Sequence, residues 1–308
     1  MTATPTVSAE VRAAVAERRP VVALESTIFS QLGLPAPHNR TALDRCVAAV
    51  RSAGAVPAIT AILDGVARVG IDPGEYDRLL AGTAKVAERD IGVAVAAGWD
   101  VGVTTVSASL ALAHAAGVGV FATGGIGGVH RGAELSGDIS ADLDALANHP
   151  LVTVCAGAKA FLDLPRTLEY LETAGVPVLA WQHDWFPAFY TRSSGLPAPH
   201  RVESADVVAG VLRARTRPSN GVLLTVPIPA SDELDPARID AAIGDALRRA
   251  TDDGVTGPKV TPFILAAIER ATSGASIPAN LALAENNAAV AGQVAAAVCA
   301  GERQRVNS

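Results

Sequence analysis

Short apolar runs alternate with helical patterns along almost the whole of this sequence. A run of four to eight apolar residues between turn signals predicts a buried strand, whereas an apolar spacing of three to four predicts a helix. Strands that alternate with helices are typical of a sheet covered by helices on both faces. No repeat, linker or break in composition divides the chain. We therefore predict α/β class: a three-layer α/β/α fold with a central mixed, mostly parallel sheet, as a single domain over residues 1–308 with its core at about 8–300.

The pattern also gives the approximate extent of each element. The expected strands cover residues 21–24, 56–63, 66–69, 118–122, 151–155, 176–181 and 222–227. Ser8 caps a first expected helix, and a helix that follows Thr105 ends near Ala116. The other expected helices cover residues 39–53, 73–80, 161–174, 204–215, 235–251, 261–271 and 277–300.

The composition excludes several classes of protein. The formal net charge is −6 and no basic block occurs, which argues against a nucleic-acid groove. Cys46, Cys155 and Cys299 lie far apart, so neither a zinc-binding pair nor a disulfide framework is expected. The first residues lack the apolar stretch of a secretory signal, and no uninterrupted apolar run reaches the roughly 18 residues of a membrane span. We expect a cytoplasmic protein without a membrane segment or a nucleic-acid partner.

The most unusual stretch runs from Val120 to Ala160 and contains two glycine pairs. They belong to the sequence Thr-Gly-Gly-Ile-Gly-Gly at residues 123–128, which directly follows an expected strand. Bare backbone N–H groups in such a loop predict an anion site for a phosphate. The spacing matches neither the dinucleotide-binding pattern nor the Walker pattern. The alternative interpretation is a tight turn that needs glycine at positive φ.

Two ionisable residues follow expected strands, where open α/β sheets place their ligands. Glu25 comes directly after residues 21–24, and its alternative role is to cap the next element. Lys159 comes after residues 151–155 and a turn of small residues. An amine set among apolar residues is a candidate nucleophile toward a sugar carbon. The alternative is a lysine whose ammonium group simply reaches the solvent.

Acidic residues follow the glycine pairs. Asp138 and Asp142 are four residues apart, and their oxygens suit a hard divalent ion such as Mg²⁺ or Mn²⁺. If Ser140 starts a helix, the same carboxylates instead favour the helix dipole. A second charged cluster, residues 85–90, is typical of a solvated face, although its apolar surroundings are compatible with one inward-pointing cation.

Together these segments resemble the pseudouridine-5'-phosphate glycosidase family, which also includes the indigoidine-cluster A-type proteins. The resemblance covers roughly residues 8–300. Its longest motif is Phe-Ala-Thr-Gly-Gly-Ile-Gly-Gly-Val-His-Arg-Gly-Ala-Glu at residues 121–134, which is too long and unusual for a chance match. Further matching segments lie at residues 22–28, 54–58, 138–143, 155–159, 169–177, 187–189, 227–229, 261–263 and 280–287.

The resemblance implies cleavage of a C–C bond, in which pseudouridine 5'-phosphate gives uracil and ribose 5-phosphate. It implies Glu25 as the general acid, Lys159 as the nucleophile that forms a covalent sugar adduct, and Asp138 as a manganese ligand that acts mostly through water. The implied substrate contacts are Lys85, the backbone at Val106, Ser140, Ala141 and Asp142, with Thr123, His130 and Asn280 as further pocket residues. One Mn²⁺ per subunit and a homotrimer are implied as well.

These residue types suit the implied chemistry. A C–C glycosidic bond has no heteroatom leaving group, so C5 of uracil must itself accept a proton. An amine bonded to the sugar carbon stabilises the resulting positive centre as an imine. A neutral lysine and a protonated acid are therefore the minimum set, unlike the two carboxylates of ordinary O-glycosidases.

Departures from the family motifs leave alternatives open. The chain has Gln-Leu-Gly-Leu at residues 31–34 where family members often have a His-Gly sequence, and the loop at residues 182–186 is its own. A C-glycosidase that acts on a modified base is therefore one alternative, and a sugar-phosphate binding protein without catalysis is another. A phosphate-dependent kinase or transferase is disfavoured because no nucleotide motif is visible. An N-nucleoside hydrolase would be recognised by cleavage of uridine 5'-phosphate.

Overall fold

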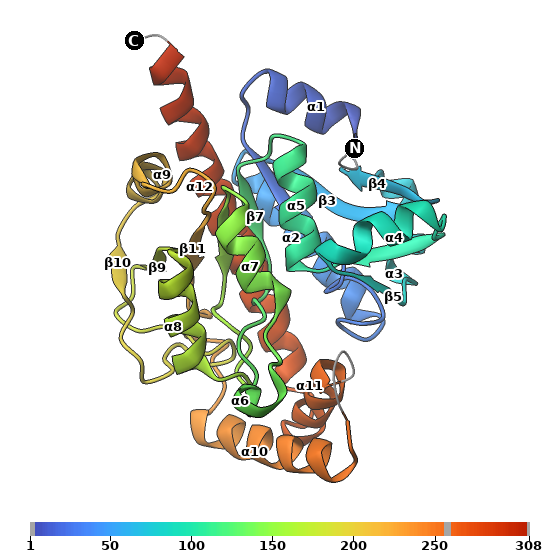
Figure 1. The fold of residues 1–308 in the computed structure, drawn as a ribbon, viewed down its shortest axis with the longest axis vertical. Helices are drawn as coiled ribbons and strands as arrows, with labels where there is room; N and C mark the ends of the chain where they lie inside the picture. Colours follow the sequence, from blue (N-terminus) through green and yellow to red (C-terminus); the bar gives the residue numbers. More distant parts are fainter. Residues whose placement is uncertain (1–3, 256–259, 307–308) are drawn as a thin grey trace.

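The computed structural model describes residues 4–255 and 260–306, with side chains up to residue 301. These residues form one α/β domain around a central sheet (Figure 1). The strands lie in the order β1-β4-β3-β2-β7-β8-β11-β9-β10, and the β5–β6 pair joins the sheet at β3. They are β1 (Thr6–Val7), β2 (Val21–Leu24), β3 (Val56–Leu63), β4 (Val66–Val69), β5 (Ala84–Val86), β6 (Val101–Thr104), β7 (Val120–Ala122), β8 (Val152–Cys155), β9 (Val178–Trp181), β10 (His200–Val202) and β11 (Val222–Thr225).

Neighbouring strands are mostly parallel. Among the named strands of the described residues, antiparallel pairing occurs only along β3, which pairs in this way with β4 and β6. The first half of β3, residues 56–59, pairs parallel with β2, while residues 61–63 lie between β4 and β6. From β2 through β7, β8, β11 and β9 to β10, every pair is parallel. The predicted mixed, mostly parallel sheet is therefore confirmed.

Helices cover both faces of this sheet. Crossovers between parallel strands are right-handed, and α2 and α7 connect strand pairs in opposite directions across the sheet, so they lie on opposite faces. The long helix α12, red in Figure 1, packs on α2 and α9, whereas α7 packs on α5 and α8. The helices are α1 (Ala9–Ala16), α2 (His38–Ser52), α3 (Tyr76–Leu80), α4 (Ile91–Ala96), α5 (Val106–Ala115), α6 (Ala133–Ser136), α7 (Ala141–Asn148), α8 (Leu164–Ala174), α9 (Ala205–Ala214), α10 (Pro236–Asp252), α11 (Val260–Ala271) and α12 (Ser276–Val306), with short 3₁₀ helices η1 (Pro73–Glu75) and η2 (Glu88–Asp90).

Most predicted elements are present, with differences at their ends. The hairpin of β3 and β4 has the predicted bounds. The helix predicted from Phe161 begins only at Leu164, because Asp163 caps it by accepting a hydrogen bond from the Arg166 backbone. Residues 101–104 were not among the expected strands, but they form β6. Strands β1, β5 and β10 have two or three residues each, too few to show a periodic pattern.

Two further expectations concern the limits of the domain. Of the predicted span 1–308, residues 1–3, 256–259 and 307–308 lie outside the described residues. None of the helices within 4–255 and 260–306 has both the length and the apolar character that crossing a membrane requires.

Candidate active site

Three adjacent parallel strands bring the predicted site together. Strand β7 pairs with β2 on one side and with β8 on the other, so the carboxyl ends of all three meet at one edge of the sheet. Glu25 directly follows β2, Thr123 directly follows β7, and the turn that leads to Lys159 follows β8. Residues far apart in the sequence therefore gather at the edge where open α/β sheets bind ligands.

Glu25 is a buried carboxyl group with a hydroxyl donor and a cation nearby. The residue is 8% exposed, and Thr123 Oγ1 donates a hydrogen bond to its Oε1. Burial raises the pKa of Glu25 to about 7, although Lys159 and the Thr123 hydrogen bond act in the opposite direction. A carboxyl group with this pKa is still protonated in about half of the molecules at neutral pH, so it can act as a general acid.

A buried network of hydroxyl groups holds the backbone beside Glu25. Ser26 Oγ accepts a hydrogen bond from the Thr104 backbone at 2.8 Å and lies 3.0 Å from Thr104 Oγ1. That hydroxyl in turn lies 2.8 Å from Thr60 Oγ1, which also donates to Ser109 Oγ at 2.8 Å. The network ties together β2, β3 and β6, and so fixes the position of the Glu25 backbone. These hydroxyls were not predicted as part of the site. Only Thr60 and Thr104 carry a signal in the sequence, because they are polar residues within apolar strands.

The cations of the site influence one another. Burial and the neighbouring Lys159 lower the pKa of Lys85, which keeps one side open to solvent, while Asp142 and Glu25 oppose this effect. Burial also lowers the pKa of His130, with Lys159 and Lys85 acting in the same direction and Asp138 in the opposite one. Glu25, Lys85, His130 and Lys159 therefore form one electrostatically coupled cluster. The Lys85 side chain is exposed, as expected for a solvated face over residues 85–90, and its charge also interacts with the charges of the site.

The glycine loop, residues 123–128, packs closely against other segments. A Cβ atom added to Gly125 would lie 2.5 Å from the Phe189 ring, and one added to Gly128 would lie 2.5 Å from Thr167 Oγ1. Neither these residues nor the other glycines of the loop have positive φ. The interpretation as a tight turn at positive φ is therefore wrong, because close approach of neighbouring side chains is what excludes a larger residue here.

The two predicted carboxylates have different partners. Asp142 is buried and accepts hydrogen bonds from the backbone of Ser107 at 3.0 Å and of Gly127 at 2.9 Å. Asp138 Oδ2 instead lies 3.7 Å from His130 Nδ1. Ser140 caps α7, as predicted, by accepting a hydrogen bond from the Asp142 backbone at 3.2 Å. The Asp142 carboxylate thus takes up part of the anion-binding capacity that we predicted for the glycine loop.

The residues around Asp138 fit a metal ion that keeps most of its water. No group of three His, Cys, Asp or Glu side chains gathers to hold a metal within the described parts of the chain. The nearest donors are the half-exposed Asp138 carboxylate and the His130 ring. Mg²⁺ and similar hard ions bind through one or two carboxylates plus water and substrate phosphate, so this donor set suits them, whereas a closed protein cage is absent from the described residues.

The remaining predicted residues lie around the glycine loop and two helix starts. Val106 is buried at the first position of α5, and Ala141 is exposed at the first position of α7. Asn280 on α12 is buried, its Oδ1 has no hydrogen-bond partner within the described chain, and it lies near Gly124. Asn287, whose role we did not predict, donates from Nδ2 to the carbonyls of Thr123 and Gly124 at 2.9 and 3.2 Å. Helix α12 therefore holds the glycine loop from one side.

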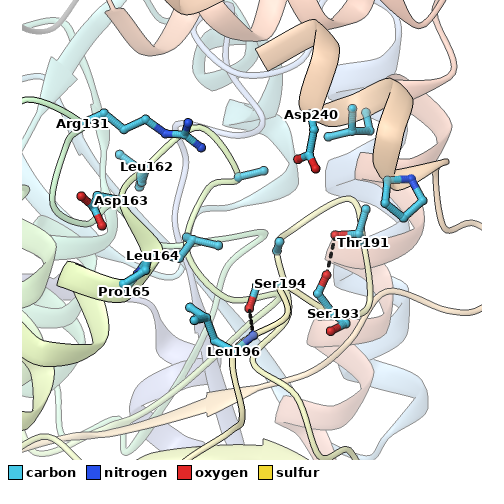
Figure 2. Close-up of a pocket in the computed structure, with 14 residues that line it drawn as sticks. Arg131, Leu162, Asp163, Leu164, Pro165, Thr191, Ser193, Ser194, Leu196 and Asp240 are labelled. Atoms are coloured by element: carbon cyan, nitrogen blue, oxygen red, sulfur yellow. Dashed lines mark hydrogen bonds between the residues drawn. The ribbon is translucent and has the colours of Figure 1, made fainter. Parts of the chain in front are cut away.

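A separate cavity of about 500 Å³ lies beside this cluster (Figure 2). Figure 2 shows Arg131 and Asp163 on one side of it, and Thr191, Ser194 and Asp240 on the other. Its lining includes residues 131 and 160, which are next to His130 and Lys159 in the sequence. Glu25, Lys85 and Lys159 themselves do not line it. The candidate active site is therefore defined by the edge of the sheet at which its residues gather and not by this cavity.

Comparisons with known proteins extend over nearly the whole chain. Residues 10–297 match the family described as Indigoidine synthase A like protein. A protein from Chloroflexus aurantiacus named pseudouridine-5'-phosphate glycosidase is 51% identical over 94% of this chain and 97% of its own length. A protein of the same name from a Roseiflexus species is 53% identical, with 95% of each chain covered.

Two solved structures share the fold. The prealnumycin C-glycosynthase AlnA, in complex with ribulose 5-phosphate, superposes with a TM-score of 0.90 at 39% identity, covering 97% of this chain and 98% of its own. An indigoidine synthase A-like protein from Thermotoga maritima superposes with a TM-score of 0.84 at 32% identity, covering 92% and 94%. Since the family match and the relatives' identity both extend over most of the chain, this protein belongs to the Indigoidine synthase A like protein family.

Proposed function

We propose that this protein reversibly cleaves the C–C glycosidic bond of pseudouridine 5'-phosphate to give uracil and ribose 5-phosphate. The observation that carries the proposal is a buried acid, Glu25, whose pKa burial raises to about 7 and whose charge interacts with that of Lys159. It occurs in a chain about half identical to proteins named pseudouridine-5'-phosphate glycosidase. An acid that is protonated near neutral pH and an adjacent amine are the minimum set for this reaction.

In the proposed reaction, the Lys159 amine attacks C1' of the sugar, the C1'–O4' bond breaks, and O4' takes up the proton that the nitrogen loses, so that the ring opens. The C1'–C5 bond then breaks, and its electron pair goes to C5 of uracil, which takes the proton from Glu25. The nitrogen lone pair forms a C1'=N bond, which stabilises the carbon left behind. Water hydrolyses this imine, releases ribose 5-phosphate and restores the amine, and Glu25 takes up a proton from solvent.

The other residues are assigned to substrate binding. Lys85, the Val106 backbone and the backbone of residues 140–142 at the start of α7 would bind the sugar phosphate, because cations and helix N-termini both favour anions. Thr123, His130 and Asn280 would line the base, and the unpartnered Asn280 oxygen offers an acceptor to a uracil N–H. Asp138 would hold one Mn²⁺ per subunit through water, and the ion would supply positive charge near the phosphate.

Borohydride trapping tests the nucleophile and the reaction class together. The protein is incubated with ribose 5-phosphate, uracil and Mn²⁺, reduced, digested and examined by mass spectrometry. We expect a sugar-phosphate mass on the Lys159 peptide and pseudouridine 5'-phosphate in solution. Lys159→Ala should remove both, whereas Lys85→Arg, the matched control at the neighbouring lysine, should keep the adduct at residue 159.

The outcomes separate the alternatives. Wild-type turnover by folded Lys159→Ala protein would remove the lysine from the mechanism. Product without any adduct would keep the reaction but contradict the imine. Cleavage of uridine 5'-phosphate at a comparable rate would favour an N-nucleoside hydrolase, and binding without turnover of either nucleotide would favour a sugar-phosphate binding protein.

A modified base is the second candidate substrate. The structurally similar AlnA is named a C-glycosynthase, and the loops at residues 31–34 and 182–186 depart from the family motifs. The second loop leads to Phe189, whose ring lies against Gly125. Comparing kcat/KM for pseudouridine 5'-phosphate with that for C-nucleotides substituted on the base tests this candidate; a substituted base preferred about tenfold would establish it.

A further inference from the structure

The proposed mechanism leaves one buried carboxylate of the site without a chemical step. Asp142 is 7% exposed, and each of its oxygens accepts a backbone hydrogen bond, Oδ1 from Ser107 at 3.0 Å and Oδ2 from Gly127 at 2.9 Å. A carboxylate satisfied in this way has little to offer a phosphate, since both groups are anions that accept hydrogen bonds. The Asp142 carboxylate is therefore poorly suited to the predicted role of substrate contact.

Its two partners belong to the segments that carry the proposed chemistry. Ser107 directly follows Val106 in the first turn of α5. Gly127 directly follows Ile126, whose carbonyl accepts a hydrogen bond from the Lys159 backbone at 3.1 Å. The carboxylate is thus the hydrogen-bonded link between a proposed phosphate contact and the segment that carries the nucleophile.

We propose that Asp142 is a positioning residue, whose buried carboxylate clamps the first turn of α5 to the glycine loop and so fixes the sugar-phosphate contacts relative to Lys159. The inference rests on the proposed function. Glycine at position 127 belongs to the same arrangement, because an added Cβ would lie 2.9 Å from Asp142 Oδ2 and would overlap Ser140 Oγ. The two backbone N–H groups donate to a charged carboxylate, and such charge-assisted hydrogen bonds are stronger than those to a neutral side chain.

The charge of this residue has a second effect, which distinguishes positioning in the site from a purely structural role. Asp142 lies close enough to Glu25 and Lys85 to raise the pKa of both groups. A neutral amide at this position therefore lowers the pKa of Glu25, and the acid stays protonated only to a lower pH.

The test compares Asp142→Asn with Asp144→Asn. Asp144 lies on the same helix, is exposed and accepts a hydrogen bond from the Tyr170 hydroxyl at 3.2 Å, so its substitution removes the same charge outside the site. In Asp142→Asn one oxygen remains, but an NH₂ group faces the second backbone donor. We expect KM for pseudouridine 5'-phosphate to rise at least about tenfold, and the basic limb of the kcat/KM profile to move to lower pH. Asp144→Asn should keep the wild-type values.

A folded Asp142→Asn protein with unchanged KM and an unchanged basic limb would overturn the proposal. If that variant does not fold, Gly127→Ala tests the clamp with the charge retained: KM should rise while the basic limb stays in place, and a wild-type KM would contradict the clamp. Absence of turnover by the wild-type protein would instead contradict the proposed function. In that case, calorimetry measures the affinity of each variant for ribose 5-phosphate. Equal affinities of Asp142→Asn and Asp144→Asn would contradict the proposed clamp.

Discussion

At the scale of single residues, burial determines the chemistry of Glu25. A carboxyl group loses stabilisation of its charged form when it leaves water, and here that loss exceeds the attraction of Lys159. In the folded state the pKa of Glu25, about 7, lies above the ordinary value of 4.5 for a glutamate. Protonated Glu25 therefore favours the folded state fully below about pH 4.5, and this contribution is lost as the pH rises through about 7.

Glu25→Gln should separate catalysis from stability. The amide cannot donate an acidic proton, so kcat should fall at least about 100-fold. It also cannot ionise, so at pH 8.5 the unfolding free energy should exceed that of the wild type by up to about 3 kcal/mol. Urea unfolding at pH 5 and pH 8.5 checks this difference. A variant less stable than the wild type at pH 8.5 would contradict the assigned pKa.

Thr123 should tune the same acid. Its hydroxyl donates to Glu25 Oε1 and lowers the pKa of that carboxyl, so Thr123→Val should move the basic limb of the pH–rate profile to higher pH. We also expect kcat to fall about tenfold, because the carboxyl loses its fixed orientation. Thr123→Ser keeps the donor and serves as the control. Identical profiles for the serine and valine variants would show that the hydrogen bond has no influence on the acid.

Asp138 is the residue that we propose to hold the Mn²⁺ ion on which activity depends. Its half-exposed carboxylate and the His130 ring fit an ion bound mostly by water, so binding should be weak and reversible. Chelation should lower the wild-type activity and added Mn²⁺ should restore it, with Asp138→Asn needing at least about tenfold more metal. Equilibrium dialysis with Mn²⁺ gives a readout independent of turnover. Equal Mn²⁺ affinity in both proteins would place the ion elsewhere.

At the scale of elements, the site depends on how the glycine loop packs between α12 and the neighbouring loops. Asn287 on α12 donates to two carbonyls of the loop, and Phe189 covers Gly125 from another segment. Backbone hydrogen bonds at Ile126 then align the loop with the segment that carries Lys159. Changes far from the reacting atoms should therefore disturb the site through this packing.

Gly125→Ala tests the packing of the loop. The added Cβ would lie 2.5 Å from the Phe189 ring, so the ring or the loop must move, at a cost of about 1–3 kcal/mol. Gly74→Ala is the matched control, because nothing lies within 4 Å of the added atom there and φ is not positive. Thermal unfolding compares the two variants. Equal melting temperatures would show that Phe189 moves aside freely.

At the scale of the whole molecule, one sheet with helices on both faces organises the chain. The cytoplasmic location stays a prediction, and so does the homotrimer. Leu135 on α6 is 93% exposed and Trp185 is 42% exposed, which is compatible with contacts between subunits. Native mass spectrometry should give three times the chain mass of 31.3 kDa. A monomer at micromolar concentration would contradict the trimer.

The sequence by itself determined the α/β class, most element positions and the identity of the central motifs. Apolar runs such as residues 56–63 and 152–155 become buried strands because their side chains need cover on both faces. It also identified Glu25 and Lys159 as residues that follow strands. These inferences succeed because each depends on neighbours along the chain.

Only the tertiary structure decided what surrounds each site residue. The burial that raises the pKa of Glu25 comes from many segments, and no local pattern contains it. The glycines at 125 and 127 are required by Phe189 and by the side chains of Ser140 and Asp142, and positive φ plays no part. Asp142 bonds to residues 35 and 15 positions away, so its role as a link between α5 and the glycine loop follows only from strands and helices brought together in space.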